Sequence, residues 1–433
     1  MPQTDSLINE LNAPHRDARL AALSALAKLE QKGAVKAPEP AGFVNNHIHT
    51  TYSFSPYSPS MALWLARRSG LVTAGIMDHD SVGGCEEFLK AGRILNMAVT
   101  CGMECRVSLT GTALDGRRVN NPDQLSVAYV AMHGIPRRSI GFCEAFIAPY
   151  RKARNARNRA MAERINAITG PFGVSVDFER DVLPLSNAAE GGSVTERHLL
   201  FALAKKLRAA YGKGEPLLCF LKEKLALEVS EKVGRYLLDP ENPYYEYDLL
   251  GALKSALVER FYIPATDELP HISDFIAASR QAGAISAYAY LGDVGDSVTG
   301  DKKTQKFEDD YLELLFDELT RLGFHAVTYM PSRNTPQQLE RVMALARRHG
   351  LFEISGEDIN SPRQSFICKA LEKPEFAHLS KATWALIGHE RAADVRLEDG
   401  MFSDRTTAAT PSLSERVERF AAIGAQGFLP VQD

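Results

Sequence analysis

The chain has 433 residues, of which 45% are hydrophobic and 24% charged, and its formal net charge is -4. This length suffices for a full-size catalytic domain with an added subdomain, and the charge gives no overall field that would attract a nucleic-acid polymer or an anionic membrane. The first residues lack the basic segment and apolar core of a signal peptide, and no run approaches the roughly 18 apolar residues of a membrane span. We therefore expect a cytoplasmic protein that acts on a small, anionic molecule held by local positive charge. The sequence carries no signal for an oligomeric state.

The first segment is predicted to be helical. Residues 5–32 have apolar side chains at helical spacing, which predicts a pair of amphipathic helices. The segment KAPEPAG (36–42) that follows is rich in proline, glycine and alanine and is interpreted as a linker.

From Phe43 onward, short apolar runs alternate with helical segments. This alternation is typical of strand–helix units that build a parallel sheet or barrel covered by helices. The predicted strands are FVNNHIHT, LVTAGIM, AVTCGMEC and SVAYVAMHG, followed after position 265 by AISAYAYL, AVTYM and LFEISGED.

The middle of the chain has a different pattern, with three long helical segments and almost no strand signal. We therefore predict an α/β barrel formed by residues 41–150 and 263–370, interrupted by a helical insertion at 151–262. An N-terminal helical extension covers residues 1–40. Residues 371–433 form a C-terminal segment whose weak periodicity predicts no particular structure.

Polar residues gather at the ends of the predicted strands. They are His47 and His49, Asp78, His79 and Asp80, Glu104, His133, and Glu357 and Asp358. Residues i and i+2 of an extended segment point to the same side, so His47 and His49 can reach one ion. The carboxyl ends of parallel barrel strands form the active-site face, and imidazole with carboxylate suits zinc, iron or manganese. A lone histidine is more often structural, so the prediction of a metal site depends on the whole series of strand-end residues.

The same residues resemble the motifs of the polymerase-and-histidinol-phosphatase (PHP) superfamily. The matching segments are NNHIHTTYSFSPYSP, GIMDHDSVGG, GMEC and ISGEDIN. The resemblance covers about residues 43–135 and 265–370, and it implies a distorted (β/α)7 TIM-like barrel, bound divalent metal and, most often, phosphoester hydrolysis. It assigns the metal ligands to His47, His49, Glu104 and Asp358, with His79 as the histidine of the second motif.

Four positions depart from the pattern of that family. They are Phe54, Tyr129, Tyr290 and Asn360, each at a position where the family has a ligand. Tyr129 has His133 nearby, and Asn360 replaces the histidine of the final Asp-x-His motif. We keep His79 and Asn360 as further candidate metal ligands. Because these changes fall mainly on the second and third metal positions, we expect one firm site for a divalent metal (zinc, manganese or iron). A second site requires His79, His133, His198 or a tyrosine to complete it.

The predicted insertion carries positive charge that could meet a phosphate. Arg197 and His198 open a predicted helix, and they resemble an Arg-His segment in the insertions of PHP nucleotide phosphatases. These two residues are interpreted either as substrate contacts or as structural residues. The basic run from Arg151 to Arg159 is interpreted as a solvated helix face.

The leading hypothesis is a metal-dependent phosphoesterase. A hydroxide bound to the metal would attack the phosphorus of a small phosphorylated metabolite or nucleotide, while His79, Asp80 or His133 moves protons. One alternative is a mononuclear amide or ester hydrolase in which Tyr129 and Tyr290 contact the substrate oxyanion. The other is a non-catalytic ligand-binding module with a PHP-like barrel, ranked lower because the histidine and carboxylate set is retained.

Overall fold

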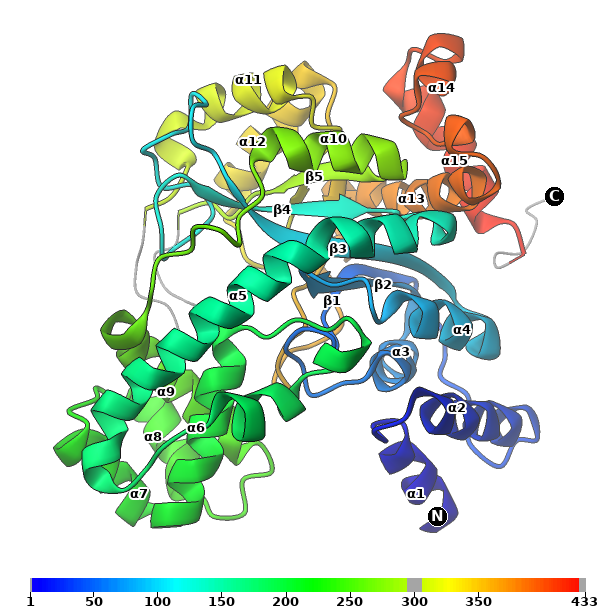
Figure 1. Ribbon diagram of the computed structural model, residues 1–433. Helices are drawn as coiled ribbons and strands as arrows, with labels where there is room; N and C mark the ends of the chain where they lie inside the picture. The colour runs from blue at the N-terminus through cyan, green and yellow to red at the C-terminus, as the bar shows by residue number, and fades with distance from the viewer. Residues whose placement is uncertain (1, 294–305, 428–433) are drawn as a thin grey trace.

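The computed structural model describes residues 2–293 and 306–427. At its centre lies a seven-stranded sheet with the strands in chain order, which curls into an open half-barrel (Figure 1). The strands are β1 (Phe43–Ile48), β2 (Leu71–His79), β3 (Ala98–Ser108), β4 (Val127–His133), β5 (Ile285–Ala289), β6 (Ala326–Tyr329) and β7 (Phe352–Ser355).

Helices surround this sheet and form most of the remaining described chain. Those before β4 are α1 (Pro2–Glu10), α2 (Arg16–Gln31), α3 (Pro59–Arg68) and α4 (Cys85–Leu95). Those between β4 and β5 are α5 (Ile140–Thr169), α6 (Glu196–Tyr211), α7 (Glu215–Cys219), α8 (Glu231–Leu238), α9 (Tyr245–Phe261) and α10 (Ile272–Ala282). The rest are α11 (Leu312–Leu322), α12 (Pro336–His349), α13 (Ala377–Val395), α14 (Asp404–Ala409) and α15 (Leu413–Ala425).

The sheet is mixed, so the expectation of a uniformly parallel barrel is wrong at β4. This strand runs antiparallel to both β3 and β5. The segment from 109 to 126 forms turns without a helix, and a strand reached without a crossover helix pairs antiparallel. As a result, Tyr129 lies opposite Arg106 near the carboxyl end of β3, whereas His133 lies toward the other end of the sheet.

A seam of side-chain hydrogen bonds joins the two edge strands. Within the described residues, one backbone bridge lies there, and it pairs Ile48 with Ile359, just beyond β7. Asn45 replaces the missing strand partner, because its Oδ1 accepts from the backbone N of Glu357 (3.0 Å) while its Nδ2 donates to the Glu357 carbonyl (3.1 Å). Asn46 Nδ2 donates to a carbonyl of β7 at 2.9 Å. The two buried asparagines thus bring the end of β1 against the segment after β7.

Helix α13 packs against β1, β3 and β7. Its buried Glu390 accepts hydrogen bonds from Thr100 Oγ1 (2.7 Å) and from the backbone N of Cys101 (2.8 Å). Helices α13 and α15 approach each other at Gly388 and Gly424, where a Cβ would overlap the backbone of the facing helix. The segment for which the sequence predicted no structure therefore covers part of the sheet; its residues 428–433 lie outside the described chain.

A second hydrophobic core fills the lobe made by α6–α9 and much of α5, seen at the lower left of Figure 1. Phe54, on the loop after β1, belongs to this core. Its ring lies 5.0 Å from that of His198 and 5.7 Å from that of Phe201, centroid to centroid. The position where the PHP family has a ligand thus anchors the helical lobe to the sheet.

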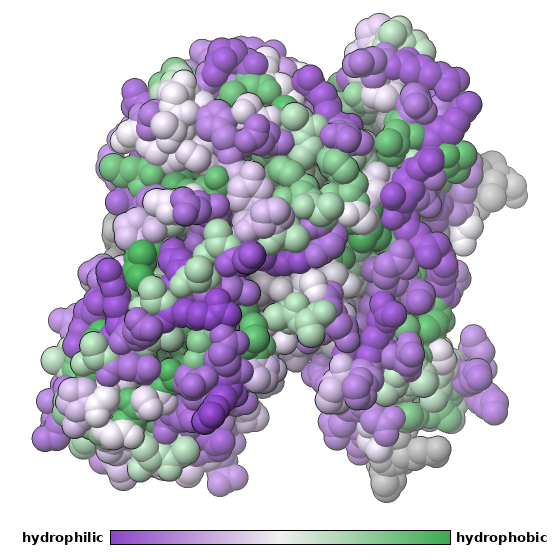
Figure 2. Space-filling model, in the orientation of Figure 1, coloured by the Kyte–Doolittle hydropathy of each residue, from purple (hydrophilic) through white to green (hydrophobic). Residues whose placement is uncertain are grey.

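The surface is largely polar on the face drawn in Figure 2, where hydrophobic residues appear in small groups. The same view shows a notch between the lobe of α6–α9 and the N-terminal helices α1 and α2. Within the described residues, no helix is both long enough and apolar enough to cross a membrane.

The seam predicts a strict requirement for glycine after β7. A Cβ at Gly356 would lie 2.6 Å from His47 Cβ and 2.8 Å from the His47 backbone N. Since both neighbours belong to the buried strand β1, we expect Gly356→Ala to lower the free energy of unfolding by about 1–3 kcal/mol, measured by urea denaturation. Gly251→Ala on α9 is the control: no atom lies within 4 Å of its Cβ. The control should raise stability by roughly 0.5–1 kcal/mol. A Gly356→Ala variant as stable as the wild type would show that Gly356 does not pack closely against β1.

Candidate metal centre

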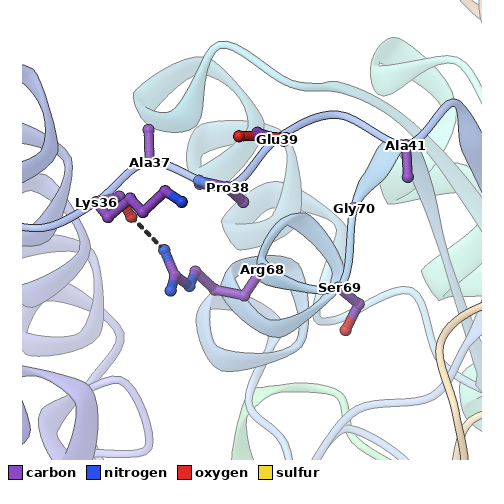
Figure 3. A pocket seen from close by; sticks show the side chains of 8 residues that line it. All are labelled: Lys36, Ala37, Pro38, Glu39, Ala41, Arg68, Ser69 and Gly70. Atoms are coloured by element: carbon purple, nitrogen blue, oxygen red, sulfur yellow. Dashed lines mark hydrogen bonds between the residues drawn. The ribbon is translucent and has the colours of Figure 1, made fainter.

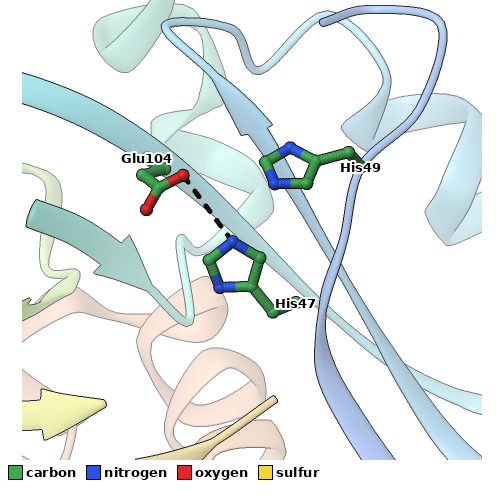
Figure 4. A group of neighbouring side chains, drawn as sticks. All are labelled: His47, His49 and Glu104. Carbon is green, nitrogen blue, oxygen red and sulfur yellow. Dashed lines mark ion pairs between the residues drawn. The ribbon is translucent and has the colours of Figure 1, made fainter. Parts of the chain in front are cut away.

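Three buried side chains converge at the carboxyl ends of β1 and β3. His47 lies on β1, His49 directly follows that strand, and Glu104 lies on β3 (Figure 4). One ligand atom from each residue lies within 4.8 Å of the other two. The exposed fractions are 9% for His47, 1% for His49 and 7% for Glu104, so the group is shielded from bulk water.

Two further residues flank this group. The register of β2 against β3 places His79 opposite Glu104, and its Nδ1 lies 3.0 Å from Glu104 Oε2. The His79 ring stacks on that of His49 with centroids 4.5 Å apart. On the other side, Asp358 Oδ1 lies 3.0 Å from His49 Nε2. The five residues form one continuous cluster of imidazole and carboxylate groups.

The charges within the cluster compensate one another. Burial opposes protonation of His47, but Glu104 outweighs it and raises the pKa of His47. Burial likewise opposes ionisation of Glu104, yet His79 and His47 lower its pKa. Burial and the neighbouring His79 lower the pKa of His49. The carboxylate is therefore ionised and His49 neutral at pH 7, which are the forms that bind a metal.

The donor set fits a divalent cation. His49 Nε2 is buried and has no hydrogen-bond partner, although Asp358 Oδ1 lies 3.0 Å away. Such an orphaned nitrogen is costly unless it has a partner. Two imidazoles and a carboxylate whose donor atoms lie within 4.8 Å of one another provide the mixed N/O set that zinc, iron or manganese accepts. His47, His49 and Glu104 would hold the ion, with Asp358 beside them.

Asn360, predicted as a candidate metal ligand, contacts Asp358. Its Nδ2 donates to Asp358 Oδ1 at 2.6 Å. Burial opposes ionisation of Asp358, but His49 outweighs it and lowers the carboxyl pKa well below its usual range. The amide thus fixes the orientation of this carboxylate. Direct ligation by Asp358 stays a prediction.

Asp80 and two arginines of the basic run lie in a buried ion-pair network. Arg154 pairs with Asp80 and is 4% exposed, and Arg157 is 9% exposed. The interpretation of the run as a solvated helix face is therefore wrong for these two residues. The full network consists of Asp80, Arg106, Arg154, Arg157, Glu196 and Glu268. It holds the carboxylate of Asp80 in a structural contact rather than leaving it available for the predicted proton transfer.

His133 does not sit at the rim with the predicted ligands, because β4 runs in the reverse direction. It is 1% exposed, and its Nε2 has no hydrogen-bond partner. Burial, assisted by the nearby His47, lowers its pKa to about 3. The side chain is therefore a neutral imidazole buried in the sheet interior, which argues against the predicted role in proton transfer.

Arg197 and His198 have different surroundings. His198 Nδ1 accepts from the backbone N of Thr195 at 2.9 Å, in a capping box that starts α6. Its ring also contacts Phe54, so this residue serves the fold of the helical lobe. Arg197 is half-buried and close enough to Asp358 to lower the pKa of that carboxyl. Its side chain makes no hydrogen bond or ion pair with another residue of the described chain. Of the two, Arg197 remains available for a substrate.

The two predicted tyrosines also differ. The Tyr129 ring lies 5.9 Å from that of His79, centroid to centroid, so it borders the metal cluster. The Tyr290 hydroxyl donates to Asp309 Oδ1 at 2.5 Å. That contact occupies its hydrogen and disfavours the predicted oxyanion role for Tyr290.

Two cavities lie elsewhere on the molecule. One, of about 320 Å³, lies between the linker at 36–41 and the end of α3 at 68–70 (Figure 3). The other, of about 350 Å³, lies between α4 and α13. Neither is lined by a residue of the metal cluster.

Comparisons with known proteins show a shared fold. No family model matches the sequence, and no curated protein matches it. A candidate metal-dependent phosphoesterase from Bifidobacterium adolescentis superposes with a TM-score of 0.51 at 20% identity, covering 77% of this chain and 96% of that one. An amidohydrolase from Chromobacterium violaceum, solved with sulfate and without metal, gives 0.48 at 16% identity, covering 78% and 96%. The second score is too low to carry an argument, and the first shows that the chain has the fold of the phosphoesterase candidate.

The buried His133 predicts a pH-dependent stability. The ordinary pKa of 6.5 applies to the unfolded chain, whereas the folded protein holds the pKa at about 3, so the unfolded state binds more protons. The stabilising contribution is present above pH 6.5 and is lost as the pH falls toward 3. The test compares the free energy of unfolding of metal-free wild type with that of metal-free His133→Phe. The difference, wild type minus variant, should fall by about 1.4 kcal/mol per pH unit between pH 6 and 4.

Urea denaturation at several pH values measures this difference. Met132→Leu, a substitution in the same strand without a titratable group, should give a difference that does not change with pH. A His133→Phe difference that is equally flat would show that His133 is not held neutral by the fold.

Proposed function

We propose that this protein is a metal-dependent hydrolase, and more specifically a phosphoesterase that acts on a small phosphorylated metabolite or nucleotide. The observation that carries the proposal is the buried group of His47, His49 and Glu104, whose ligand atoms lie within 4.8 Å of one another. Within this group His49 Nε2 is buried and has no hydrogen-bond partner, which leaves a nitrogen that can bind an ion. The fold shared with a candidate metal-dependent phosphoesterase is consistent with the proposal.

We also propose that the chain is a divergent relative of the PHP superfamily. Support comes from the motif residues, since His47, His49, His79, Glu104 and Asp358 lie in one cluster. Two of the four departures from the family pattern have structural explanations. Phe54 packs in the helical lobe, and Tyr290 pairs with Asp309. We therefore propose one firm metal site, formed by the three converging ligands.

The bound metal would polarise a phosphoryl oxygen and lower the pKa of a water molecule at the site. The protein's own residues would do the rest. The half-buried guanidinium of Arg197 would bind the phosphate, because planar donors suit its oxygens and this one has no described partner. His79, whose side chain is 25% exposed, would exchange a proton with the substrate side of the cluster. Tyr129, which borders His79, would close the pocket beside it.

The single metal group also favours a second candidate, an amide or ester hydrolase. One group of three converging ligands is present in the described residues, and one ion suffices to hydrolyse such bonds. Tyr129 could donate to the oxyanion of that reaction, whereas Tyr290 is occupied.

The metal content and the substrate class test the proposal together. Elemental analysis of protein purified without chelator should give about one divalent ion per chain, and a substrate panel should show hydrolysis of phosphate monoesters or nucleotides. His49→Ala and Glu104→Gln should lose both the ion and the activity, since each removes a ligand. His15→Ala, which removes an exposed histidine of α2's N-terminus, should retain both.

The panel also separates the alternatives. Hydrolysis of amides or esters without any of phosphates would favour the second candidate. A protein that binds no metal after addition of zinc or manganese, and that hydrolyses nothing, would be a ligand-binding module and would contradict the proposal.

Arg197 should govern binding of the phosphate group. Arg197→Ala is expected to lower kcat/KM for a phosphate ester roughly 10- to 150-fold, the effect of about 1.5–3 kcal/mol for a hydrogen bond to a charged group. Lys205→Ala on the same helix, whose ammonium lies over the Phe201 ring, should have little effect. Metal binding should be the same in Arg197→Ala as in the wild type. Unchanged kinetics in this variant would show that Arg197 does not contact the substrate.

A further inference from the structure

A buried carboxylate organises the loop that follows the first two metal ligands. Asp78, on β2, is 1% exposed. Its Oδ1 accepts from the backbone N of Thr50 (2.7 Å) and from Ser53 Oγ (2.6 Å), and its Oδ2 accepts from Thr50 Oγ1 (2.6 Å). Three donors from one short loop thus meet one carboxylate that has acceptors only.

This arrangement determines the role of the Ser53 hydroxyl. A serine hydroxyl has one hydrogen, and here that hydrogen is given to Asp78. The same Oγ lies 3.3 Å from His49 Nδ1. Because the hydrogen of Ser53 is already used, its oxygen can only accept from His49. The hydrogen of this second contact therefore belongs to Nδ1 of the imidazole.

A neutral imidazole carries one hydrogen, so the opposite nitrogen of His49 has a free lone pair. That nitrogen, Nε2, is buried and lacks a hydrogen-bond partner. Nε2 lies 3.0 Å from Asp358 Oδ1 without a hydrogen bond to it, as expected for a nitrogen that carries no hydrogen. Both ends of the ring consequently agree on the same tautomer.

We propose that Ser53 and Asp78 are positioning residues that hold His49 as the Nδ1–H tautomer and direct the Nε2 lone pair into the metal cluster. The relay runs from Asp78 through the Ser53 hydroxyl to His49, and all three side chains are almost fully buried. Its effect on metal affinity rests on the proposed function, but the tautomer itself is a property of the metal-free protein. Outer partners of this kind typically contribute 10- to 100-fold to metal affinity.

The helical lobe fixes the same loop from the other side. The backbone N of Ser193 donates to the Tyr52 carbonyl at 2.7 Å, and Phe54 packs into the core of that lobe. Ser53 lies between these two anchors and is fully buried. Its hydroxyl is therefore held at the imidazole by contacts on both sides.

The first experiment reads the tautomer directly. Metal-free protein labelled with 15N-histidine is examined by long-range 1H–15N correlation NMR, with the His49 signals identified by their loss in His49→Gln. We expect the wild type to show His49 protonated at Nδ1 and unprotonated at Nε2. A His49 ring protonated at Nε2 would overturn the inference, and this measurement needs no Ser53 variant to fold.

The second experiment measures zinc affinity by competition with a chelator. Ser53→Ala should bind zinc 10- to 100-fold more weakly and lose the single tautomer. Ser53→Thr, which retains the hydroxyl, should stay within about threefold of the wild type. Ser55→Ala, in the same loop but hydrogen-bonded only to the backbone N of Tyr57, is the matched control. If Ser53→Ala kept both the zinc affinity and the His49 tautomer of the wild type, the inference would be overturned.

The two readouts separate this inference from the proposed function. An Nδ1–H tautomer in a protein that binds no zinc would support the positioning pair and contradict the metal-dependent function. Zinc binding by a protein whose His49 is protonated at Nε2 in the metal-free state would support the metal-dependent function and contradict the positioning role of Ser53 and Asp78.

Discussion

The close approach of β1 to the segment after β7 is the constraint on which the candidate centre depends. A single backbone bridge connects these segments, and the side chain of Asn45 supplies the donor and acceptor that a neighbouring strand would otherwise provide. The approach leaves no room for a Cβ at Gly356 beside His47. Because His49 and Asp358 belong to opposite sides of this seam, their 3.0 Å contact exists only while the half-barrel stays curled. A polar seam in the core is costly unless every group finds a partner, and most of these groups do.

The helical lobe is more than an addition to the outside of the sheet. Phe54 packs in its core, and the buried ion pairs of Arg154 and Arg157 link α5 to the end of β2 and to the start of α6. Taking these charges into the interior costs desolvation energy that offsets much of their attraction, and each ion pair requires the present arrangement of lobe and sheet. That arrangement holds the loop from Thr50 to Phe54, which carries the contact to His49 Nδ1, and brings Arg197 close to Asp358.

The sequence predicted the strands that carry the cluster, because several short apolar runs in order each end in histidine or carboxylate. His47, His49 and Glu104 do converge. It did not predict the reversed direction of β4, although the helix-free segment 109–126 was a signal for it. It named Asp78 among the strand-end residues without assigning it a role, and it did not single out Ser53. Spacing identifies residues that face a metal ion, but not residues that contact only one of the metal ligands. The crossing of α13 and α15 at Gly388 and Gly424 depends on contact between distant segments, which no local periodicity encodes.

The central claim is that His47, His49 and Glu104 hold one divalent ion between β1 and β3. Anomalous diffraction tests it most directly, with crystals grown in zinc and data recorded on both sides of the zinc absorption edge. The account predicts an anomalous peak within coordination distance of both imidazoles and of the Glu104 carboxylate, present in the wild type and absent in a crystal of His49→Ala. A wild-type crystal with no peak among these three residues, or with zinc bound only at other positions, would contradict the account.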